Sequence, residues 1–273
     1  MGVLAVMTVR NEAGYIETTL RSLISDGVEV ILIDHGSIDG TRDLAAQFLG
    51  GGLLRILDVP WRGVYDLTQL LAHQREVYRT SSHDWHIRVD ADEWLRATVN
   101  ATLAEFLEYQ VADRHWVVNF DEFVFLPPQG VDMWGEDYRR IATDYYYFEP
   151  QPTRLMRAWR RGTVDDFVSG AGHTFVGLAP ERIHPQNQVM RHYIGLSWSH
   201  AIDKRASRRY GESDLTKGWH ANRLRMESAW PVTASPILRR AEPWHRRCLD
   251  RSDPSWFHFW QRDFPRLPHA VGA

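Results

Sequence analysis

The chain has 273 residues, a formal net charge of −3 and a sequence pI of about 6.5, with 44% hydrophobic residues. These values fit one large globular domain and exclude disordered and fibrous classes. The near-neutral charge argues against bulk electrostatic binding to nucleic acid or an anionic membrane. The single cysteine, Cys248, cannot form an internal disulfide. No apolar run approaches the roughly 20 residues of a transmembrane segment, and no secretory signal is recognised, so we expect a cytoplasmic protein.

Strand-like and helix-like segments alternate through the first half of the chain. Short apolar, β-branched runs predict buried strands, and apolar residues at helical spacing predict the helices between them. The predicted strands are 3–9, 28–33, 53–59, 85–89 and 115–125, and the predicted helices are 12–24, 42–49, 64–80 and 98–109. This order predicts an α/β fold with a doubly wound, mostly parallel, Rossmann-like sheet.

The second half is less regular. Residues 126–151 are rich in Pro, Gly and aromatic residues and are interpreted as a long loop. We predict that this loop is a mobile lid, and a fixed, packed excursion is the alternative. A strand is expected at 153–159 and a helix over 202–219, followed by a tail rich in tryptophan.

Polar clusters follow three of the predicted strands: 10–12, 34–39 and 90–93. Ligands of such sheets bind beyond the carboxyl ends of the strands. In the third cluster Asp90 and Asp92 are two residues apart, so both carboxylates can face a divalent cation. Mg²⁺ and Mn²⁺ prefer carboxylate oxygens together with phosphate oxygens. A solvated acidic loop is the alternative for an isolated pair of this kind, but the position after a buried strand favours a binding site.

The cluster that begins at Asp34 has the sequence Asp-His-Gly-Ser-Ile-Asp-Gly-Thr, ending at Thr41. A carboxylate ends the strand, glycines form the turn and Thr41 can begin the next helix. Such an edge can hold a ribose hydroxyl or a base through its carboxylates. An ordinary β–α turn is the alternative interpretation.

Together, 8–12, 34–41 and 90–95 resemble the inverting nucleotide-sugar glycosyltransferases of family 2, which have a GT-A fold. The resemblance is strongest over 3–96. The middle motif departs from the family at His35, where a second Asp is usual. The third motif resembles the Asp-Ala-Asp-Glu variant of a bacterial subgroup.

The resemblance implies a GT-A-like sheet with an irregular C-terminal acceptor region and a helical tail. Residues 1–125 would form the nucleotide-sugar (donor) half. Residues 126–218 would form the acceptor and catalytic half of the same domain. Residues 219–273 would be a Trp-rich tail.

The family resemblance also implies which residues contact the donor and a metal ion. The expected donor contacts are Thr8, Val9, Arg10, Glu12, Asp34, Asp39, Gln74, Arg75, Arg88, Asp90 and Ala91. For Gln74 and Arg75, an exposed helix face is an equal alternative. The metal, Mn²⁺ or Mg²⁺, would be held by Asp90, Asp92 and a C-terminal histidine. His192 is preferred for that ligand over His173 and His200.

Inverting transfer also needs a general base, usually a carboxylate, to deprotonate the acceptor hydroxyl. The candidates are Asp166, slightly preferred, and Asp137, for which a helix start is the alternative. His173 could instead contact the acceptor. Aromatic residues near the expected acceptor region could form a sugar platform or pack in the core. They are Trp134, Tyr145, Tyr146, Tyr147 and Trp159.

The expected function is therefore a metal-dependent inverting glycosyltransferase, an enzyme of EC 2.4 type. It would use a UDP-, GDP- or dTDP-sugar and a hydroxyl acceptor, without nucleic acid and without a transmembrane segment. A homodimer stays open. A sugar-nucleotide nucleotidyltransferase is the first alternative, but it would need a Gly-rich basic loop where 9–15 offers only Gly14. A non-catalytic nucleotide-sugar-binding protein is the second. A Rossmann dehydrogenase is disfavoured because no GxGxxG follows the first strand.

Overall fold

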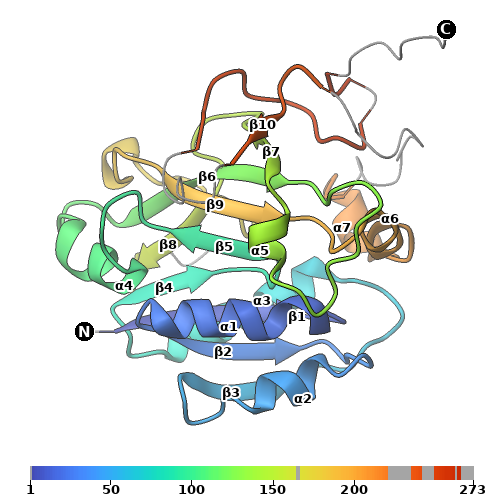
Figure 1. Ribbon diagram of the computed structural model, residues 1–273. Helices are drawn as coiled ribbons and strands as arrows, with labels where there is room; N and C mark the ends of the chain where they lie inside the picture. The colour runs from blue at the N-terminus through green and yellow to red at the C-terminus, as the bar shows by residue number, and fades with distance from the viewer. Residues whose placement is uncertain (1, 164–166, 221–234, 242–248, 262, 266–273) are drawn as a thin grey trace, which may run out of the picture.

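The structure is a computed structural model that describes residues 2–163, 167–220, 235–241, 249–261 and 263–265. Among these residues a mixed sheet has the strand order β10-β7-β6-β8-β4-β1-β2-β3, and β5 and β9 lie off this path (Figure 1). The strands are β1 (Val3–Val9), β2 (Val28–Asp34), β3 (Leu53–Asp58), β4 (Trp85–Arg88), β5 (Glu93–Arg96), β6 (Val117–Phe125), β7 (Asp144–Phe148), β8 (Met156–Arg160), β9 (Gln188–Tyr193) and β10 (Arg239–Arg240). The helices are α1 (Ala13–Ser25), α2 (Thr41–Ala46), α3 (Leu67–Thr80), α4 (Leu103–Glu105), α5 (Tyr138–Ile141), α6 (Trp198–Ala206) and α7 (Glu212–Thr216). Phe106–Gln110 form a π-helical turn and Pro180–Arg182 a 3₁₀ turn.

The first half confirms the predicted α/β alternation. Strands β3, β2, β1 and β4 are parallel neighbours, with Val9 paired with Asp34 at the carboxyl end of β1. Successive β1 side chains point to opposite faces of the sheet. Val3 and Ala5 therefore join the buried cluster that includes residues of α1, whereas Leu4 and Val6 join the cluster that includes residues of α3. Helices on both faces bury both sides of this part of the sheet, as the apolar strand sequences predict.

The sheet changes direction beyond β4. Strand β8 is antiparallel to β4 and also to β6, so a strand of the second half lies between two strands of the first. Residues 117–119 of β6 pair with β8, and residues 120–125 pair with β9. Strand β9 carries β5 as its antiparallel partner. The long strand β6 thus connects the parallel part of the sheet to the smaller group formed by β5, β7 and β9.

Three predicted segments differ from the structure. The helix expected over 98–109 is reduced to α4 and the following π-helical turn, and β5 precedes it. The segment 126–151 is not one loop, because it contains α5 and β7. The helix expected over 202–219 is divided into α6 and α7. Long-range pairing accounts for the two additional strands: β5 pairs with β9, about a hundred residues later, and β7 pairs with β6.

Most of the expected aromatic platform belongs to the core. The three tyrosines 145–147 lie in β7 and are buried, and Trp159 of β8 is buried in the cluster shared with α3. Trp134 is the exception, with 46% of its surface exposed. Its ring also covers Gly14 at the start of α1, where an added Cβ would lie 2.8 Å from Trp134 Cζ3. The packed alternative therefore describes this part of the expected lid, and opening of the segment stays a prediction.

A buried carboxylate from α7 holds the beginning of α3. Asp214 Oδ2 accepts a hydrogen bond from Leu67 N (2.6 Å), and Asp214 Oδ1 accepts bonds from Thr68 N (3.1 Å) and Thr68 Oγ1 (2.6 Å). The first N–H groups of a helix lack partners within the helix, so this carboxylate satisfies two of them from a distant part of the chain.

Asp214→Ala should therefore lower the free energy of unfolding by about 2–3 kcal/mol, because the buried helix N–H groups lose a charged acceptor. Urea denaturation followed by circular dichroism measures the change. Glu212→Ala, at an exposed position in the same helix, is the matched control. Equal urea midpoints for the two variants would contradict the assigned role of Asp214.

Candidate active site

The carboxyl ends of the parallel strands lie on the same side of the molecule as α6 and α7 (Figure 1). In the figure the arrowheads of β2 and β9 both point toward these helices. The polar clusters of 10–12, 34–39 and 90–93 are therefore brought to one edge of the sheet, as predicted from their positions after the strands.

The first two polar clusters are joined by side-chain hydrogen bonds. Asp39 accepts bonds from Ala13 N (3.0 Å) and from Thr41 N (3.0 Å). Thr41 Oγ1 in turn accepts a bond from Glu12 N at 2.7 Å. Asn11, with a left-handed φ of 55°, accepts a bond from Ile38 N at 2.9 Å. Asp39 is exposed but committed to the turn, so its first role is to shape the edge of the site.

Asp34 ends β2 as a buried carboxylate. One oxygen, Oδ2, accepts a bond from Ser37 N at 3.1 Å. The other, Oδ1, is buried and has no hydrogen-bond partner among the described residues. A buried acceptor left without a partner is costly, so this oxygen is available to a donor group of a ligand.

Arg10 and Trp61 form a stacked pair beside this turn. The Arg10 guanidinium carbon lies 3.9 Å from the Trp61 ring centroid, and its Nη1 donates to the carbonyls of His35 and Gly36. The His35 ring packs edge-on against Trp61 at 4.9 Å. Burial and the neighbouring Arg10 charge lower the pKa of His35, so this histidine is neutral at pH 7. A neutral ring therefore stands where an acidic side chain is usual in the resembling family.

Gln74 and Arg75 differ in placement although they are adjacent on α3. Gln74 is buried and its Nε2 donates to Thr8 Oγ1 at 2.8 Å, while its Oε1 is buried without a partner among the described residues. Arg75 lies on the exposed face of α3. The structure thus brings Gln74, but not Arg75, to the end of β1.

Arg88 and Asp90 lie under a glycine turn of the second half. Arg88 is buried, and its guanidinium is 3.4 Å from both Gly172 O and Asp90 Oδ1. Gly172 has a left-handed φ of 71°, and an added Cβ would lie 3.0 Å from Arg88 Nε. The turn before His173 is therefore next to the Asp-Ala-Asp segment, and contact of His173 with an acceptor stays a prediction. Ala91 is buried, and its carbonyl accepts a bond from Thr19 Oγ1 at 2.6 Å.

Asp92 is at the centre of a buried charge cluster. Its Oδ2 is 2.9 Å from Lys204 Nζ of α6 and 3.5 Å from His192 Nε2 of β9. Lys204 Nζ is also 2.7 Å from Glu12 Oε2, and Arg208 Nη2 is 3.8 Å from the other Glu12 oxygen. Burial alone would raise the pKa of Asp92, but Lys204 and His192 outweigh it and hold that pKa well below its usual range. Asp92 is a carboxylate at neutral pH.

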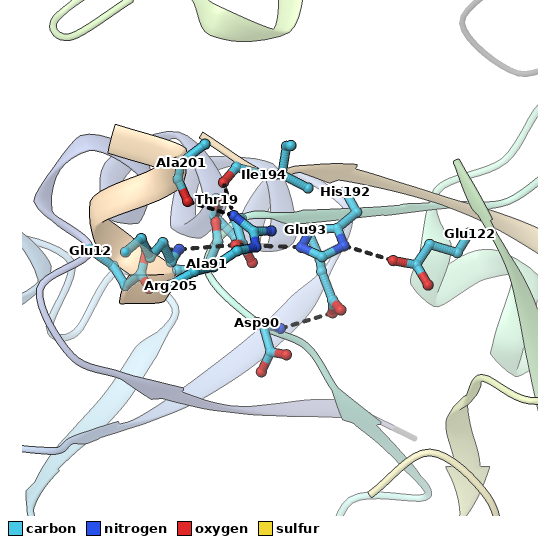
Figure 2. A network of polar contacts seen from close by, with 12 residues as sticks. Glu12, Thr19, Asp90, Ala91, Glu93, Glu122, His192, Ile194, Ala201 and Arg205 are labelled. Carbon is cyan, nitrogen blue, oxygen red and sulfur yellow. Dashed lines mark hydrogen bonds and ion pairs between the residues drawn. The ribbon is translucent and has the colours of Figure 1, made fainter. Parts of the chain in front are cut away.

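The two ring nitrogens of His192 face two different carboxylates. Nδ1 is 2.7 Å from Glu122 Oε1, and Figure 2 shows the ring directed toward that carboxylate. Nε2 is directed at Asp92. A carboxylate that orients the far nitrogen of a histidine is the usual arrangement around a metal-binding imidazole.

Asp90, Asp92 and His192 are the side chains that could hold Mn²⁺ or Mg²⁺. Among the described residues, no group of three or more His, Cys, Asp or Glu side chains is arranged to hold a metal ion. Asp92 and His192 nevertheless face one another, and Asp90 has a side chain that is 39% exposed. The residues fit a site in which protein supplies a few ligands and a phosphate-bearing substrate supplies others, which is common for these hard cations.

Glu93 lies beneath the same segment. One of its oxygens accepts a bond from Asp90 N at 3.0 Å (Figure 2), and the other pairs with the buried Arg157 of β8. Burial, together with the Asp90 charge, raises the pKa of Glu93 to about 8. Glu93 therefore fixes the backbone of the Asp-Ala-Asp turn rather than facing the expected ligand.

Of the two candidate bases, the structure describes only Asp137. Asp137 is exposed and precedes α5, whose Tyr138 packs edge-on against Tyr15 at 5.1 Å. Asp166 lies outside the described residues.

His200, the third metal-ligand candidate, accepts a bond from Leu196 N at 3.1 Å through Nδ1. Burial and Lys204 lower its pKa to about 4, so it is neutral at pH 7.

Several residues of this site have no role predicted from the sequence, above all Lys204, which follows the 191–193 segment in a looser part of the family resemblance. Its two partners are 192 and 112 positions away in the chain, so no local pattern joins them. A signal does exist, because Lys204 and Lys217 are the two lysines of an otherwise arginine-rich chain. Trp61, Glu122 and Arg208 had no comparable signal.

The family model described as glycosyl transferase family 2 matches residues 4–167, more than half of the chain. The chain belongs to glycosyl transferase family 2. The mixed α/β architecture with a mostly parallel central sheet agrees with this family membership and confirms the expected fold class. The narrower Asp-Ala-Asp-Glu subgroup stays a prediction.

Similar proteins include one curated relative and several crystal structures. The chain is 29% identical over 118 residues to the "Lipopolysaccharide core biosynthesis glycosyltransferase LpsC" of Rhizobium meliloti (strain 1021), covering 40% of this chain and 41% of LpsC. This family 2 chain therefore matches less than half of that relative's length. S. aureus TarS is 12% identical with a TM-score of 0.41, covering 76% of this chain and 38% of TarS. Its 1–349 fragment in complex with UDP is 12% identical with a TM-score of 0.37, covering 76% and 63%.

No helix in the described part of this family 2 member is both long enough and apolar enough to cross a bilayer.

Proposed function

We propose that the chain transfers a glycosyl group from a nucleoside diphosphate sugar to a hydroxyl group of an acceptor, with inversion and with Mn²⁺ or Mg²⁺. One observation carries the proposal: in a family 2 chain, the Asp34 turn and the Asp90–Asp92 segment meet at the carboxyl edge of one sheet. The two ends of a nucleoside diphosphate sugar need these two kinds of group, a hydrogen-bonding edge and a cation-binding edge.

The nucleoside end of the donor would lie at the ends of β1 and β2. Asp34 Oδ1 and Gln74 Oε1 are buried acceptors without partners in the described residues, and N–H or O–H groups of a base or ribose would satisfy them. The Arg10–Trp61 stack provides a flat surface beside them. Because His35 is neutral, it adds no negative charge beside this surface, which suits an uncharged base.

The diphosphate would lie over Asp90 and Asp92, with Asp92 and His192 as the preferred metal ligands and Asp90 as a further ligand. When bound, the cation would offset the negative charge that develops on the leaving diphosphate. Glu122 orients His192 and Glu93 fixes the Asp90 backbone, so both would position ligands without touching the substrate.

The reaction requires one proton transfer by the protein. Asp166 or Asp137 would accept the proton of the acceptor hydroxyl as its oxygen bonds to the anomeric carbon. On the opposite face, the bond from that carbon to the diphosphate oxygen breaks, and the diphosphate leaves with the electron pair. The similarity to LpsC supports a saccharide hydroxyl as the first acceptor class to test.

The direct test is a panel of UDP-, GDP- and dTDP-sugars, assayed for Mn²⁺-dependent donor hydrolysis and for thermal stabilisation of the protein. One nucleotide should stabilise the protein and release its sugar slowly to water. Stabilisation without hydrolysis, and without transfer to any saccharide acceptor, would favour the non-catalytic nucleotide-sugar binder. The absence of both signals for all three bases would contradict the proposal.

Asp34→Asn should weaken binding of the selected nucleotide by roughly ten- to a hundredfold, the usual cost of losing a charged hydrogen-bond acceptor. Isothermal titration calorimetry measures the affinity. Asp58→Asn is the matched control, because Asp58 also ends a parallel strand but is exposed and paired with Arg42. Equal affinities for the two variants would remove Asp34 from the nucleoside site.

A further inference from the structure

Lys204 occupies the position that a divalent cation would need at Asp92. Its Nζ is 2.9 Å from Asp92 Oδ2 and 2.7 Å from Glu12 Oε2, and all three side chains are close to fully buried. Two buried carboxylates that share a site repel one another unless a positive charge lies between them. The ammonium of Lys204 therefore offsets part of the charge of this pair in the free protein, and Arg208 lies beside Glu12 as a second cation.

Glu12 has a second positive group beside it, in addition to this ammonium. Among the described residues the hydrogen-bond partners of Lys204 are the two carboxylates, and its Nζ lies 5.0 Å from the centroid of the Tyr15 ring. Arg208 is 3.8 Å from the second oxygen of Glu12. Glu12 would thus keep a counter-charge if the flexible lysine stem turned away from Asp92.

A free metal ion would gain little at this site. A dipositive ion bound at Asp92 would be repelled by the ammonium, and this repulsion is screened less in a partly buried site than in bulk water. The described residues also provide fewer than three grouped ligands. A diphosphate changes both conditions, because it brings oxygen ligands for the metal and negative charge that can accept the displaced ammonium.

We propose that Lys204 and a divalent cation compete for Asp92, so that the free protein binds the metal weakly and takes it up together with the diphosphate of the donor. This inference rests on the proposed metal site of the transferase. The Lys204 ammonium would then move from Asp92 to a phosphate oxygen. The same side chain would offset negative charge in the free protein and contact the diphosphate when donor and metal are bound.

The test measures Mn²⁺ binding by electron paramagnetic resonance in the absence of nucleotide. Lys204→Gln should bind Mn²⁺ at least about tenfold more tightly than the natural chain, because the competing charge is gone. Lys204→Arg should resemble the natural chain. Lys217→Gln, the other lysine, is the matched control and should also be unchanged, since its exposed Nζ contacts Thr68. Equal Mn²⁺ affinity in Lys204→Gln and the natural chain would overturn the inference.

A second measurement covers loss of stability in Lys204→Gln, in which Glu12 and Asp92 face one another with less positive charge between them. Mn²⁺ should raise the thermal midpoint of this variant by more than that of the natural chain. A purely structural ion pair would lower the midpoint without such recovery, and this result would contradict the inference. If Mn²⁺ binds none of the proteins even with nucleotide, the metal site and the inference both fail, whereas nucleotide stabilisation without metal would leave the transfer proposal standing.

Discussion

Replacing Asp92 by Asn should lower transferase turnover by roughly 10³-fold or more and remove the Mn²⁺-dependent part of donor binding. A metal ion contributes several kcal/mol to stabilising the charge on a leaving diphosphate, and Asp92 is its central expected ligand. We expect the variant to fold although Asp92 is a buried partner of Lys204, because Lys204 keeps Glu12 as its partner in the variant.

Turnover with the selected donor, together with titration of Mn²⁺ and nucleotide, measures this effect. Asp43→Asn is the control, because Asp43 is exposed in the first turn of α2. Circular dichroism and the thermal midpoint verify the fold of both variants. Mn²⁺-dependent binding that persists unchanged in Asp92→Asn would exclude Asp92 as a metal ligand.

The general base gives the second large effect. Asp166→Asn, or failing that Asp137→Asn, should reduce turnover by roughly 10²- to 10⁴-fold and leave donor affinity unchanged. The amide keeps the size of the side chain but cannot accept the acceptor proton. Glu136→Gln, also exposed and adjacent to Asp137, controls for the loss of an acid in that segment.

Steady-state turnover with a saccharide acceptor, compared with nucleotide affinity from calorimetry, separates the base from a binding residue. A fall in affinity equal to the fall in turnover would identify a binding residue instead. Full turnover in both aspartate variants would show that the base lies elsewhere or that the proton leaves by another route.

The parallel part of the fold was predictable because its signals are local. Strand β1 is a short apolar run, β2 is mostly apolar, and β4, with the sequence Trp-His-Ile-Arg, is buried throughout, so the sheet edge followed from where these strands end. The same rule located Asp34 and Asp92. Gln74 and Arg75 could not be separated from sequence, because the rotation of α3 against the sheet decides which of two neighbours is buried.

The smaller group of strands was not predictable in this way. Strand β5 contains Glu93 and Arg96, charges that usually argue against a buried strand, and their partners Arg157 and Asp26 lie about 65–70 positions away. The charge cluster around Lys204 has the same origin. Its members come from β9, α6 and the ends of β1 and β4, so the sequence could supply the acids but not the cation between them.

The insertion of β8 between β4 and β6 sets a limit on how relatives of this protein can be recombined. A fragment that ends at residue 125 would remove β8 and leave its two neighbours, β4 and β6, each with an unpaired edge that could pair with another chain. Chimeras that exchange acceptor regions should therefore keep β8 together with β4, its pairing partner, and change only the segments around β8. Variation in acceptor use would be expected to accumulate in those surrounding segments, while the crossing strand stays with the host sheet.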